Sequence, residues 1–452
     1  MTRNRHIYSI LKTSLPAALD LASQPIMWLI EAVFIGRLSA AALGGVGFAL
    51  QIILVTITIL LTFVTGAIIL INRELGKKNH WQANHIVGQT VMVSFILAVP
   101  IGLLWYFGSP VLFAIINEHA TQAISGMESG VEYLRLIAYF APVLIPNFIA
   151  VSLIRGSGDT HVSMMINIVM NLTNVVLSPV LIYGLFGLPR LEVAGAAYAM
   201  GIAHTLGFVM TFCYLRRRRS TIFLSFREMT TPNFESFKRL FSLGLPTTVE
   251  QMVWSGGMLV VTGFVAVMGI TQLAIHQLFA RIQAVLSMLY MGFGLAAMSH
   301  VGQNIGANDH KLALRTGRIT RRINLLLGFL VLIVLVVFSE PILHLFIRKE
   351  DTVIADYGFK TVFFVFAMVQ VPKALNAVIS GSLRGAGEIR WLMYVNIVTV
   401  LVIEIGCNWA GAFIFKWGLV GIWAIQGADE VLKAFLNRRR FHGGNWKLSK
   451  YI

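Results

Sequence analysis

Acidic side chains interrupt several long apolar stretches of the sequence, where a charge is expensive. Asp20, Glu31, Glu250 and Glu404 lie well inside such stretches, and Asp429 lies in a less apolar one. A charged side chain at the centre of a bilayer costs roughly 2.5–3.5 kcal/mol, so acids placed there commonly bind ions, protons or substrates. Removal from water favours the neutral form of a carboxyl group, and a nearby cation favours its charged form. A proton and a cationic cargo can therefore compete for one acid, which is the minimal chemistry of antiport.

Two of these acids share one helix face near the N-terminus. Asp20, Gln24, Met27 and Glu31 recur at the spacing of a single helix face, and Pro25 should kink that helix. We predict that Glu31 binds the coupling proton or cation and that Asp20 takes part in coupling. Two alternatives stay open: Glu31 is neutral and only structural, or Asp20 is solvated at the cytoplasmic end of the helix.

The predicted support for Glu31 comes from a later apolar stretch, which carries Asn171 and Asn174. Amide oxygens beside a carboxylate suit hard cations, so these three residues are also the predicted site if sodium is the coupling ion. The two cysteines, Cys213 and Cys407, have no metal-ligand spacing and give no disulfide framework. We expect no cofactor.

The second half of the chain carries one acid in a comparable setting. Glu250 shares a helix face with Trp254, Gly257 and Val261. We predict that Glu250 contributes to coupling or substrate binding, with Arg281 as its ion-pair partner. The alternative is that a Glu250–Arg281 pair only holds two helices together. The sequence assigns no role to the remaining two intramembrane acids.

Methionine and tryptophan side chains on the same helices are candidates for the lining of a substrate cavity. Methionine is flexible and polarizable, which suits a site for varied ligands. The alternative for each of these residues is packing or contact with lipid. The predicted lining consists of Gln24, Met27, Trp28, Trp254, Met258, Met288 and Met291.

The elements that must position these residues are membrane helices. Apolar residues make up 57% of the 452 residues and charged residues only 12%, against about 25% charged in a typical soluble domain. The first apolar run lacks a small-residue cleavage site, so we expect a retained helix and not a signal peptide. Twelve apolar windows have spanning length, at 14–35, 43–72, 85–107, 131–153, 162–184, 193–215, 241–268, 273–301, 319–338, 354–382, 392–415 and 418–436.

The two halves of the chain are an internal sequence repeat. RGSGD at 155–159 recurs as RGAGE at 384–388, and Pro16 and Asp20 recur as Pro246 and Glu250. Six helices return the chain to its starting side, so the predicted fold is an all-α integral membrane protein with twelve transmembrane helices in two parallel six-helix repeats. The predicted domains are an N-lobe at 1–215, a cytoplasmic linker at 216–239 and a C-lobe at 240–452 with a basic cytoplasmic tail.

Basic residues set the predicted orientation. One set of loops and both termini together hold 27 Lys and Arg, the opposite loops hold five, and four lie inside predicted helices. This asymmetry predicts that both termini are cytoplasmic. We interpret the net charge of +16 and the run at 216–219 as topology signals, and we expect no nucleic-acid partner. The two RGxG segments are predicted to be tight cytoplasmic turns, each with its arginine at the lipid interface.

The ordered motifs of the chain resemble those of the multidrug and toxin extrusion (MATE) family of cation-coupled antiporters, over essentially the whole length. In the first half they are Pro16, Glu31-x-x-Phe34-Ile35-Gly36-Arg37-Leu38, Arg155-Gly156-Ser157-Gly158-Asp159, Asn171-x-x-Asn174-x-x-x-Ser178-Pro179 and Val193-Ala194-Gly195-Ala196-Ala197. In the second half they are Gly244-Leu245-Pro246-x-x-x-Glu250, Ala274-x-His276-Gln277, Arg281-Ile282, Val301-Gly302-Gln303-Asn304-Ile305-Gly306-Ala307 and Leu383-Arg384-Gly385-Ala386-Gly387-Glu388.

The resemblance implies two six-helix bundles in a V shape and efflux of amphipathic, often cationic, organic compounds in exchange for H⁺ or Na⁺ by alternating access. It implies a monomer in the lipid bilayer of a prokaryotic plasma (inner) membrane. The chain departs from the family pattern at three places. Glu31 and Ser178 stand where relatives usually have aspartate, and Gln283 stands where many carry an acid.

A flippase and an intramembrane enzyme are the alternative functions. A related flippase for lipid-linked saccharides should carry several inward Lys or Arg for pyrophosphate, whereas only Arg135, Arg281, Lys360 and Lys373 fall inside predicted helices. An intramembrane enzyme is a remote alternative, because the chain has no His-Glu-x-x-His, Gly-x-Ser-x-Gly or paired aspartate motif. We therefore predict a transporter and not an enzyme. The absence of Gly-x-x-x-x-Gly-Lys argues against a nucleotide-driven pump.

Overall fold

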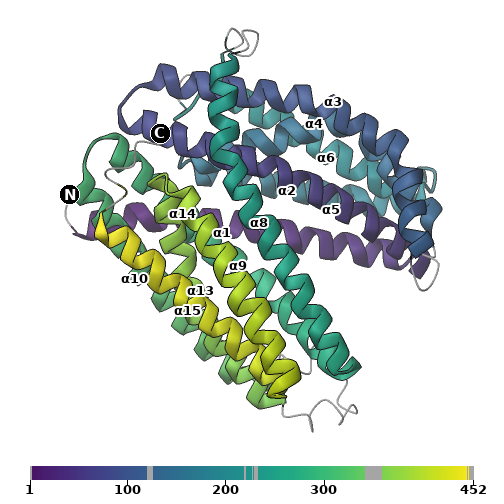
Figure 1. Ribbon diagram of the computed structural model, residues 1–452. Helices are drawn as coiled ribbons and strands as arrows, with labels where there is room; N and C mark the ends of the chain where they lie inside the picture. The colour runs from purple at the N-terminus through teal and green to yellow at the C-terminus, as the bar shows by residue number, and fades with distance from the viewer. Residues whose placement is uncertain are drawn as a thin grey trace. The chain divides into compact units, whose positions relative to one another are not determined.

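A computed structural model describes residues 3–119, 126–217, 220–225, 228, 233–341, 359–444 and 446, and all of its regular elements are helices (Figure 1). The first half contains α1 (Arg3–Gly36), α2 (Ala40–Gly76), α3 (His80–His119), α4 (Met127–Gly156), α5 (Thr160–Tyr183), the 3₁₀ turn η1 (Leu185–Gly187) and α6 (Glu192–Leu215). The second half contains α8 (Phe234–Met268), α9 (Ile270–Gly306), α10 (His310–Val337), α13 (Phe359–Gly385), α14 (Ile389–Thr399), the π-helical segments η2 (Val400–Cys407) and η3 (Ala410–Ile414), and α15 (Gly418–Gly443).

Eleven spans within the described residues are long and apolar enough to cross a membrane. They match the first eleven predicted windows, with α14, η2 and η3 together forming the span Ile389–Ile414. The twelfth window corresponds to α15, which has 26 residues but is less apolar because it carries Asp429, Glu430 and Lys433. The prediction of an all-helical membrane fold is confirmed, and α15 is the one helix whose composition needs a further explanation.

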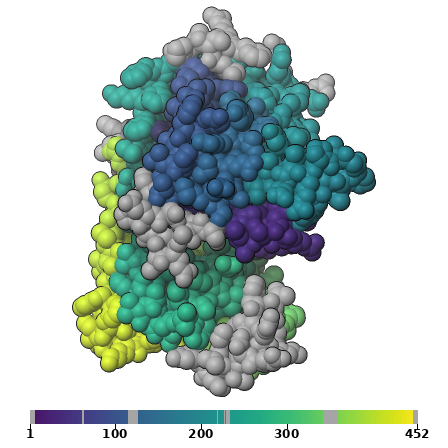
Figure 2. Space-filling model, turned by 90° about the vertical axis from the view of Figure 1, so that its right-hand side faces the viewer, coloured from purple at the N-terminus to yellow at the C-terminus, as the bar shows by residue number. Residues whose placement is uncertain are grey.

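The chain divides into two compact units. Unit 2 comprises Leu19–Glu74 and Asn79–Gly244, and within it α4 packs against α3, α5 and α6. In the space-filling view the blue residues of this unit form a continuous packed body (Figure 2). The predicted linker 216–239 lies partly outside the described residues.

Unit 1 comprises Met1–Ala18, Leu75–Lys78 and Leu245–Ile452, so the start of α1 groups with the second half of the chain. Its central helix is α13, which packs against α9, α10 and α15. A buried aromatic cluster joins three of these helices: Phe279 of α9 contacts Phe366 of α13 and Trp423 of α15, with ring centroids 4.8 and 5.7 Å apart. The core of this unit therefore fixes α15 against α13.

The two RGxG segments are tight turns, as predicted. RGSGD ends α4 and leads into α5, and RGAGE ends α13 and leads into α14. The backbone φ angles of Gly158 and Gly387 are 107° and 86°, in the region that residues with a Cβ rarely adopt. The duplicated glycine thus lets each half make the same reversal of direction at the end of a membrane helix.

Close packing of α9 on α13 depends on a residue without a side chain. A Cβ added to Gly381 of α13 would lie 2.1 Å from the carbonyl oxygen of Gly294 on α9. We expect Gly381→Val to lower the free energy of unfolding by at least about 2 kcal/mol, because the helices must separate to admit the side chain. Unfolding of the purified protein in SDS titrations would measure the change.

The matched control is Gly256→Val on α8, because a Cβ at Gly256 meets nothing within 4 Å. This control should stay within about 1 kcal/mol of wild type. Equal effects of the two substitutions would contradict the packing argument.

Candidate functional site

Asp20 lies in a fully satisfied ion pair inside unit 2. Its side chain is 0% exposed, and Arg155 Nη1 approaches Asp20 Oδ2 at 3.2 Å. Ser163 donates to the same oxygen at 2.8 Å, and Asn167 Nδ2 donates to Oδ1 at 2.5 Å. The alternative of a solvated Asp20 is therefore wrong. Three helix-borne groups converge on this carboxylate, and both of its oxygens have a partner.

Glu250 occupies the equivalent place in unit 1. Arg384 Nη2 approaches Glu250 Oε1 at 2.7 Å, and Asn396 Nδ2 donates to the backbone carbonyl of Glu250 at 2.9 Å. The predicted pair with Arg281 is wrong, because Arg281 is exposed and Arg384 is the residue that contacts Glu250. The physical reason is the RGAGE turn, which ends α13 beside α8 and directs its arginine at the acid.

The two halves thus repeat one arrangement. In each half the acid four residues after the duplicated proline pairs with the arginine of the RGxG turn, as Asp20–Arg155 and Glu250–Arg384. The arginines were predicted to be lipid-interface anchors, and the structure corrects this: their side chains are 14% and 29% exposed and point to carboxylates. The pair in unit 2 is the more deeply buried of the two.

Glu31 has a different environment from both of these acids. It is 1% exposed, and its only hydrogen bond within the described residues joins Tyr133 OH to Glu31 Oε1 at 3.1 Å. The same hydroxyl lies 3.2 Å from the sulfur of Met200. The second carboxyl oxygen, Oε2, is buried and has no hydrogen-bond partner in the described part of the chain. No basic side chain of the described residues pairs with this carboxyl group, which makes it the acid best suited to hold a proton.

Asn171 and Asn174 do not supply the predicted contacts to Glu31. Asn171 Nδ2 donates to Ser23 Oγ at 3.1 Å, about two helix turns before Glu31 along α1, and Asn174 Oδ1 accepts from Ser178 at 2.7 Å. The prediction that their amides bond to Glu31 is therefore corrected. Helix α5 uses one amide to hold α1 at Ser23, and the other is occupied by its own serine one turn later.

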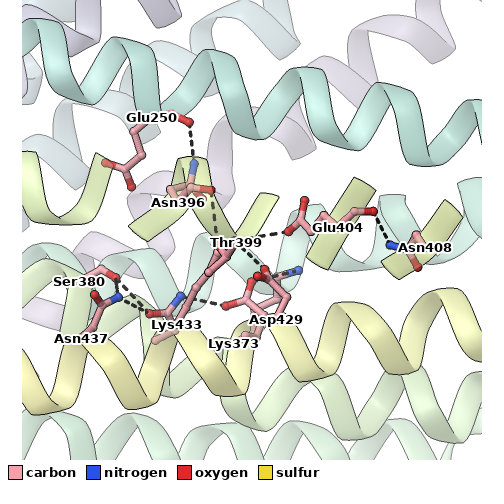
Figure 3. Close-up of polar contacts among 12 residues, drawn as sticks. Glu250, Lys373, Ser380, Asn396, Thr399, Glu404, Asn408, Asp429, Lys433 and Asn437 are labelled. Atoms are coloured by element: carbon pink, nitrogen blue, oxygen red, sulfur yellow. Dashed lines mark hydrogen bonds and ion pairs between the residues drawn. The ribbon is translucent and has the colours of Figure 1, made fainter. Parts of the chain in front are cut away.

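A buried charge cluster in unit 1 was missed as a site by the sequence-based interpretation (Figure 3). It is called the Lys433 cluster here and consists of Lys373, Glu404, Asp429, Glu430 and Lys433. Lys433 Nζ lies 2.6 Å from Asp429 Oδ2 and 3.4 Å from Glu404 Oε1, and Lys373 Nζ lies 3.7 Å from Glu430 Oε1. The five side chains are between 0% and 11% exposed.

Two signals in the sequence pointed to this cluster without identifying it. Glu404 was recognised as an intramembrane acid without an assigned role, and Lys373 was counted among the basic residues inside helices. Lys433 lies inside the predicted window 418–436 but was given no role, and the structure places it inside α15 and 7% exposed. Lys433 pairs with Asp429, four residues earlier on the same helix, and with Glu404, 29 residues earlier on η2. The spacing of the first pair is visible in the sequence, whereas the second pair depends on how the helices pack.

The sequence model of the MatE family matches residues 16–180 and 246–410, one match in each half of the chain. The chain belongs to the MATE family. The match covers both acid–arginine pairs and Glu31, whereas Asp429, Glu430 and Lys433 lie beyond it.

Relatives of this MATE protein align over nearly its full length. Probable multidrug resistance protein NorM of Thermotoga maritima is 25% identical over 442 residues, covering 97% of this chain and 92% of the relative. A protein of the same name from Burkholderia mallei is 28% identical and covers 98% of this chain and 93% of its own length. Multidrug resistance protein MdtK of Yersinia enterocolitica is 26% identical, with coverage of 86% and 84%.

Solved structures show the same fold. An outward-facing multidrug resistance MATE family transporter of the MOP superfamily matches with a TM-score of 0.86 and 20% identity, covering 97% of this chain and 96% of that one. A MOP superfamily transporter from Pyrococcus furiosus, whose binding pocket is described as having reverse polarity, matches with the same TM-score and coverage. This MATE protein is therefore a multi-pass membrane transporter with the fold of its family.

The residues predicted to line a substrate cavity differ in exposure. In unit 2 of this MATE protein, Met27 is buried at 4% exposure, and Gln24 and Trp28 are partly buried. In unit 1, Trp254, Met258 and Met288 are partly buried, and Met291 is 51% exposed. Their role in binding stays a prediction.

Proposed function

We propose that this MATE transporter is a secondary active multidrug antiporter. It exports amphipathic, often cationic, organic compounds in exchange for H⁺ or Na⁺ by alternating access. The observation that carries the proposal is the carboxyl group of Glu31, which is 1% exposed, faces no base and keeps one oxygen free of hydrogen bonds within the described residues. Such a group is uncharged while it is sealed from water and is charged when it meets a cation.

The proposal extends to the cell and to the topology of the chain. The relatives named as multidrug resistance proteins are bacterial, which supports a place in a prokaryotic plasma membrane. The distribution of Lys and Arg supports cytoplasmic termini. We propose a monomer, divided into the lobes 1–215 and 240–452 by the segment 216–239. Asp20 and Glu250 hold the duplicated arginines in this scheme, Asn171 supports α1 through Ser23, and no cofactor is used.

Gradient-driven transport in proteoliposomes tests the proposal. Purified protein is reconstituted, and movement of tetraphenylphosphonium is followed under a pH gradient alone, a Na⁺ gradient alone and no gradient, with membrane potential clamped. We expect one of the two gradients to drive accumulation against the concentration gradient of the cation, because the free energy of the coupling ion is the only source of work.

Two controls complete this test. Protein-free liposomes measure leakage of the lipophilic cation, and an ionophore that collapses the effective gradient should abolish accumulation. Transport that neither gradient accelerates, or that persists after both gradients are collapsed, would contradict the antiporter proposal.

A further inference from the structure

Lys433 is held inside unit 1 as a cation between two acids (Figure 3). Its ammonium lies 2.6 Å from Asp429 Oδ2 and 3.4 Å from Glu404 Oε1, and its side chain is 7% exposed. A buried lysine is expensive unless it is paired, so these contacts explain why it is tolerated inside a membrane helix. The ammonium occupies the position that a bound cation would take between two carboxylates.

The charges of the Lys433 cluster do not balance. The cluster contains the carboxyl groups of Glu404, Asp429 and Glu430 and the ammonium groups of Lys373 and Lys433, which leaves one negative charge when all are ionised. The charged groups that act on Lys373 are the other four members of the cluster. A sealed cluster with one surplus negative charge must take up one more positive charge, and the smallest is a proton.

Within the described residues, only Lys373 and Lys433 form ion pairs with the three acids of the cluster. On α8 and α13, Glu250 is neutralised by Arg384. On α9, His276 is 4% exposed, and its ring lies against Trp423, with centroids 5.4 Å apart. Glu430 Oε2 also accepts a hydrogen bond from Asn376 Nδ2 at 2.9 Å, and this neutral amide adds no charge to the cluster. Since Lys373 pairs with Glu430, the surplus negative charge lies on Glu404 and Asp429, the two acids that share Lys433.

An open position for the proton is present on one of those acids. Asp429 is 0% exposed, and its Oδ1 has no hydrogen-bond partner in the described part of the chain. One helix turn after Glu404, Asn408 is 1% exposed and its Oδ1 is likewise unpartnered. Buried polar atoms normally have partners, so the unpartnered oxygen of Asp429 indicates a missing proton or cation.

The backbone at Glu404 is also unusual. Glu404 lies in the π-helical segment η2, a rare form that is frequently found at functional sites. A Cβ added to Gly257 of α8 would lie 3.5 Å from Glu404 Oε2 and 2.4 Å from a methyl group of Val400. The cluster thus borders the face of α8 that carries Glu250, Trp254 and Met258, and its charge can act on that face.

We propose that the Lys433 cluster is a second coupling site, in which Lys433 is a tethered cation in place of a metal ion and the Glu404–Asp429 pair carries one exchangeable proton. This inference rests on the proposed antiport function and names a coupling ion and residues for unit 1. When the cluster opens to water, the carboxyl O–H bond breaks, the proton passes to water and the surplus negative charge remains. The site then favours any returning proton, and the tethered ammonium repels Na⁺ from the same carboxylates.

Replacing the tethered cation should convert the site into a Na⁺ site. The experiment measures the thermal unfolding midpoint of purified full-length protein in detergent, in Na⁺ or in choline at equal ionic strength. We expect Na⁺ to raise the midpoint of Lys433→Gln by at least about 3 °C and that of wild type by less than about 1 °C.

The matched control is Arg440→Gln on the same helix. Arg440 Nη2 pairs with Glu388 at 2.9 Å, and Glu388 is 5% exposed, so this variant also leaves a buried acid without its base but lies outside the Lys433 cluster. A Na⁺ response of equal size in both variants, or none in Lys433→Gln, overturns the proposal. The measurement needs no transport, so a wild type that moves no organic cation would contradict the proposed function and leave this result standing.

A second measurement keeps the inference testable if Lys433→Gln does not fold. Infrared difference spectra across an upward pH step are recorded for Glu31→Gln, which removes the other candidate proton carrier. We expect one protonated-carboxyl band to be lost on raising the pH, and we expect it to be absent when Asp429→Asn or Glu404→Gln is added, because two acids balance two lysines. Persistence of the band in both double variants overturns the proposal.

Discussion

Glu31→Gln should reduce gradient-coupled efflux by at least about tenfold, which corresponds to about 1.4 kcal/mol in the coupled step. Glu31 is 1% exposed, and its hydrogen bond with Tyr133 can be kept by a glutamine oxygen, so the variant removes the exchangeable proton and preserves the packing. Exchange of labelled for unlabelled organic cation without a gradient should be largely retained, because that exchange needs no net proton movement. Efflux and exchange are measured in the same proteoliposomes.

The matched control for this substitution is Glu192→Gln. Glu192 begins α6 in the same unit, and its side chain is 61% exposed and pairs with Arg190 at the surface, so the same change of chemistry occurs in water. This control should keep both activities. Full gradient-coupled efflux by Glu31→Gln would remove Glu31 from the coupling mechanism, and loss of both activities in parallel would assign it to substrate binding or stability instead.

The sequence was sufficient for the helices and for the acids, because both follow from local properties. Apolar windows of spanning length predict membrane helices from composition alone, and the cost of a charge in lipid singles out Asp20, Glu31 and Glu250. The duplicated proline and RGxG motifs predicted the two matching turns. These features need no knowledge of which helices touch.

The partners of those acids could not be predicted in the same way. Arg281 and Arg384 are both arginines on neighbouring helices, and the choice between them depends on the helix packing that places Arg384 2.7 Å from Glu250 and leaves Arg281 exposed. The duplication offered a clue, because Arg155 and Arg384 occupy the same place in the two halves. Pairing each of them with the duplicated acid would have predicted both ion pairs.

The Lys433 cluster could not be predicted from the sequence for a similar reason, because its ion pairs also depend on helix packing. A lysine near the end of the chain fits a basic cytoplasmic tail, and the charge count alone cannot distinguish that place from a buried one. The informative signal was the low hydropathy of the last window, which holds Asp429, Glu430 and Lys433 within five residues of α15. An i,i+4 acid–lysine pair in a helix that must be buried indicates internal pairing.

Arg155→Ala should lower the free energy of unfolding by about 3–5 kcal/mol, and Arg384→Ala by about 1–3 kcal/mol. Removing either arginine leaves its acid without a cation, and the penalty depends on how far that acid is from water. Asp20 is 0% exposed, whereas the side chain of Glu250 is 16% exposed and can recover part of its solvation. SDS unfolding titrations of the two purified variants measure the difference.

A double-mutant cycle separates the ion pair from general damage to α4. Adding Asp20→Asn to Arg155→Ala should recover at least about 1 kcal/mol, because the second change removes the buried charge that the first left unpaired. Ser163 and Asn167 still have an oxygen at residue 20 to contact. Arg135→Ala is the control on the same helix, since Arg135 is exposed and donates only to a backbone carbonyl of Tyr106 in the described residues. If Arg135→Ala costs as much as Arg155→Ala, or if the double variant recovers nothing, the arginine of the duplicated turn does not act through the acid, and the repeated acid–arginine pair would have no part in holding the two halves in shape.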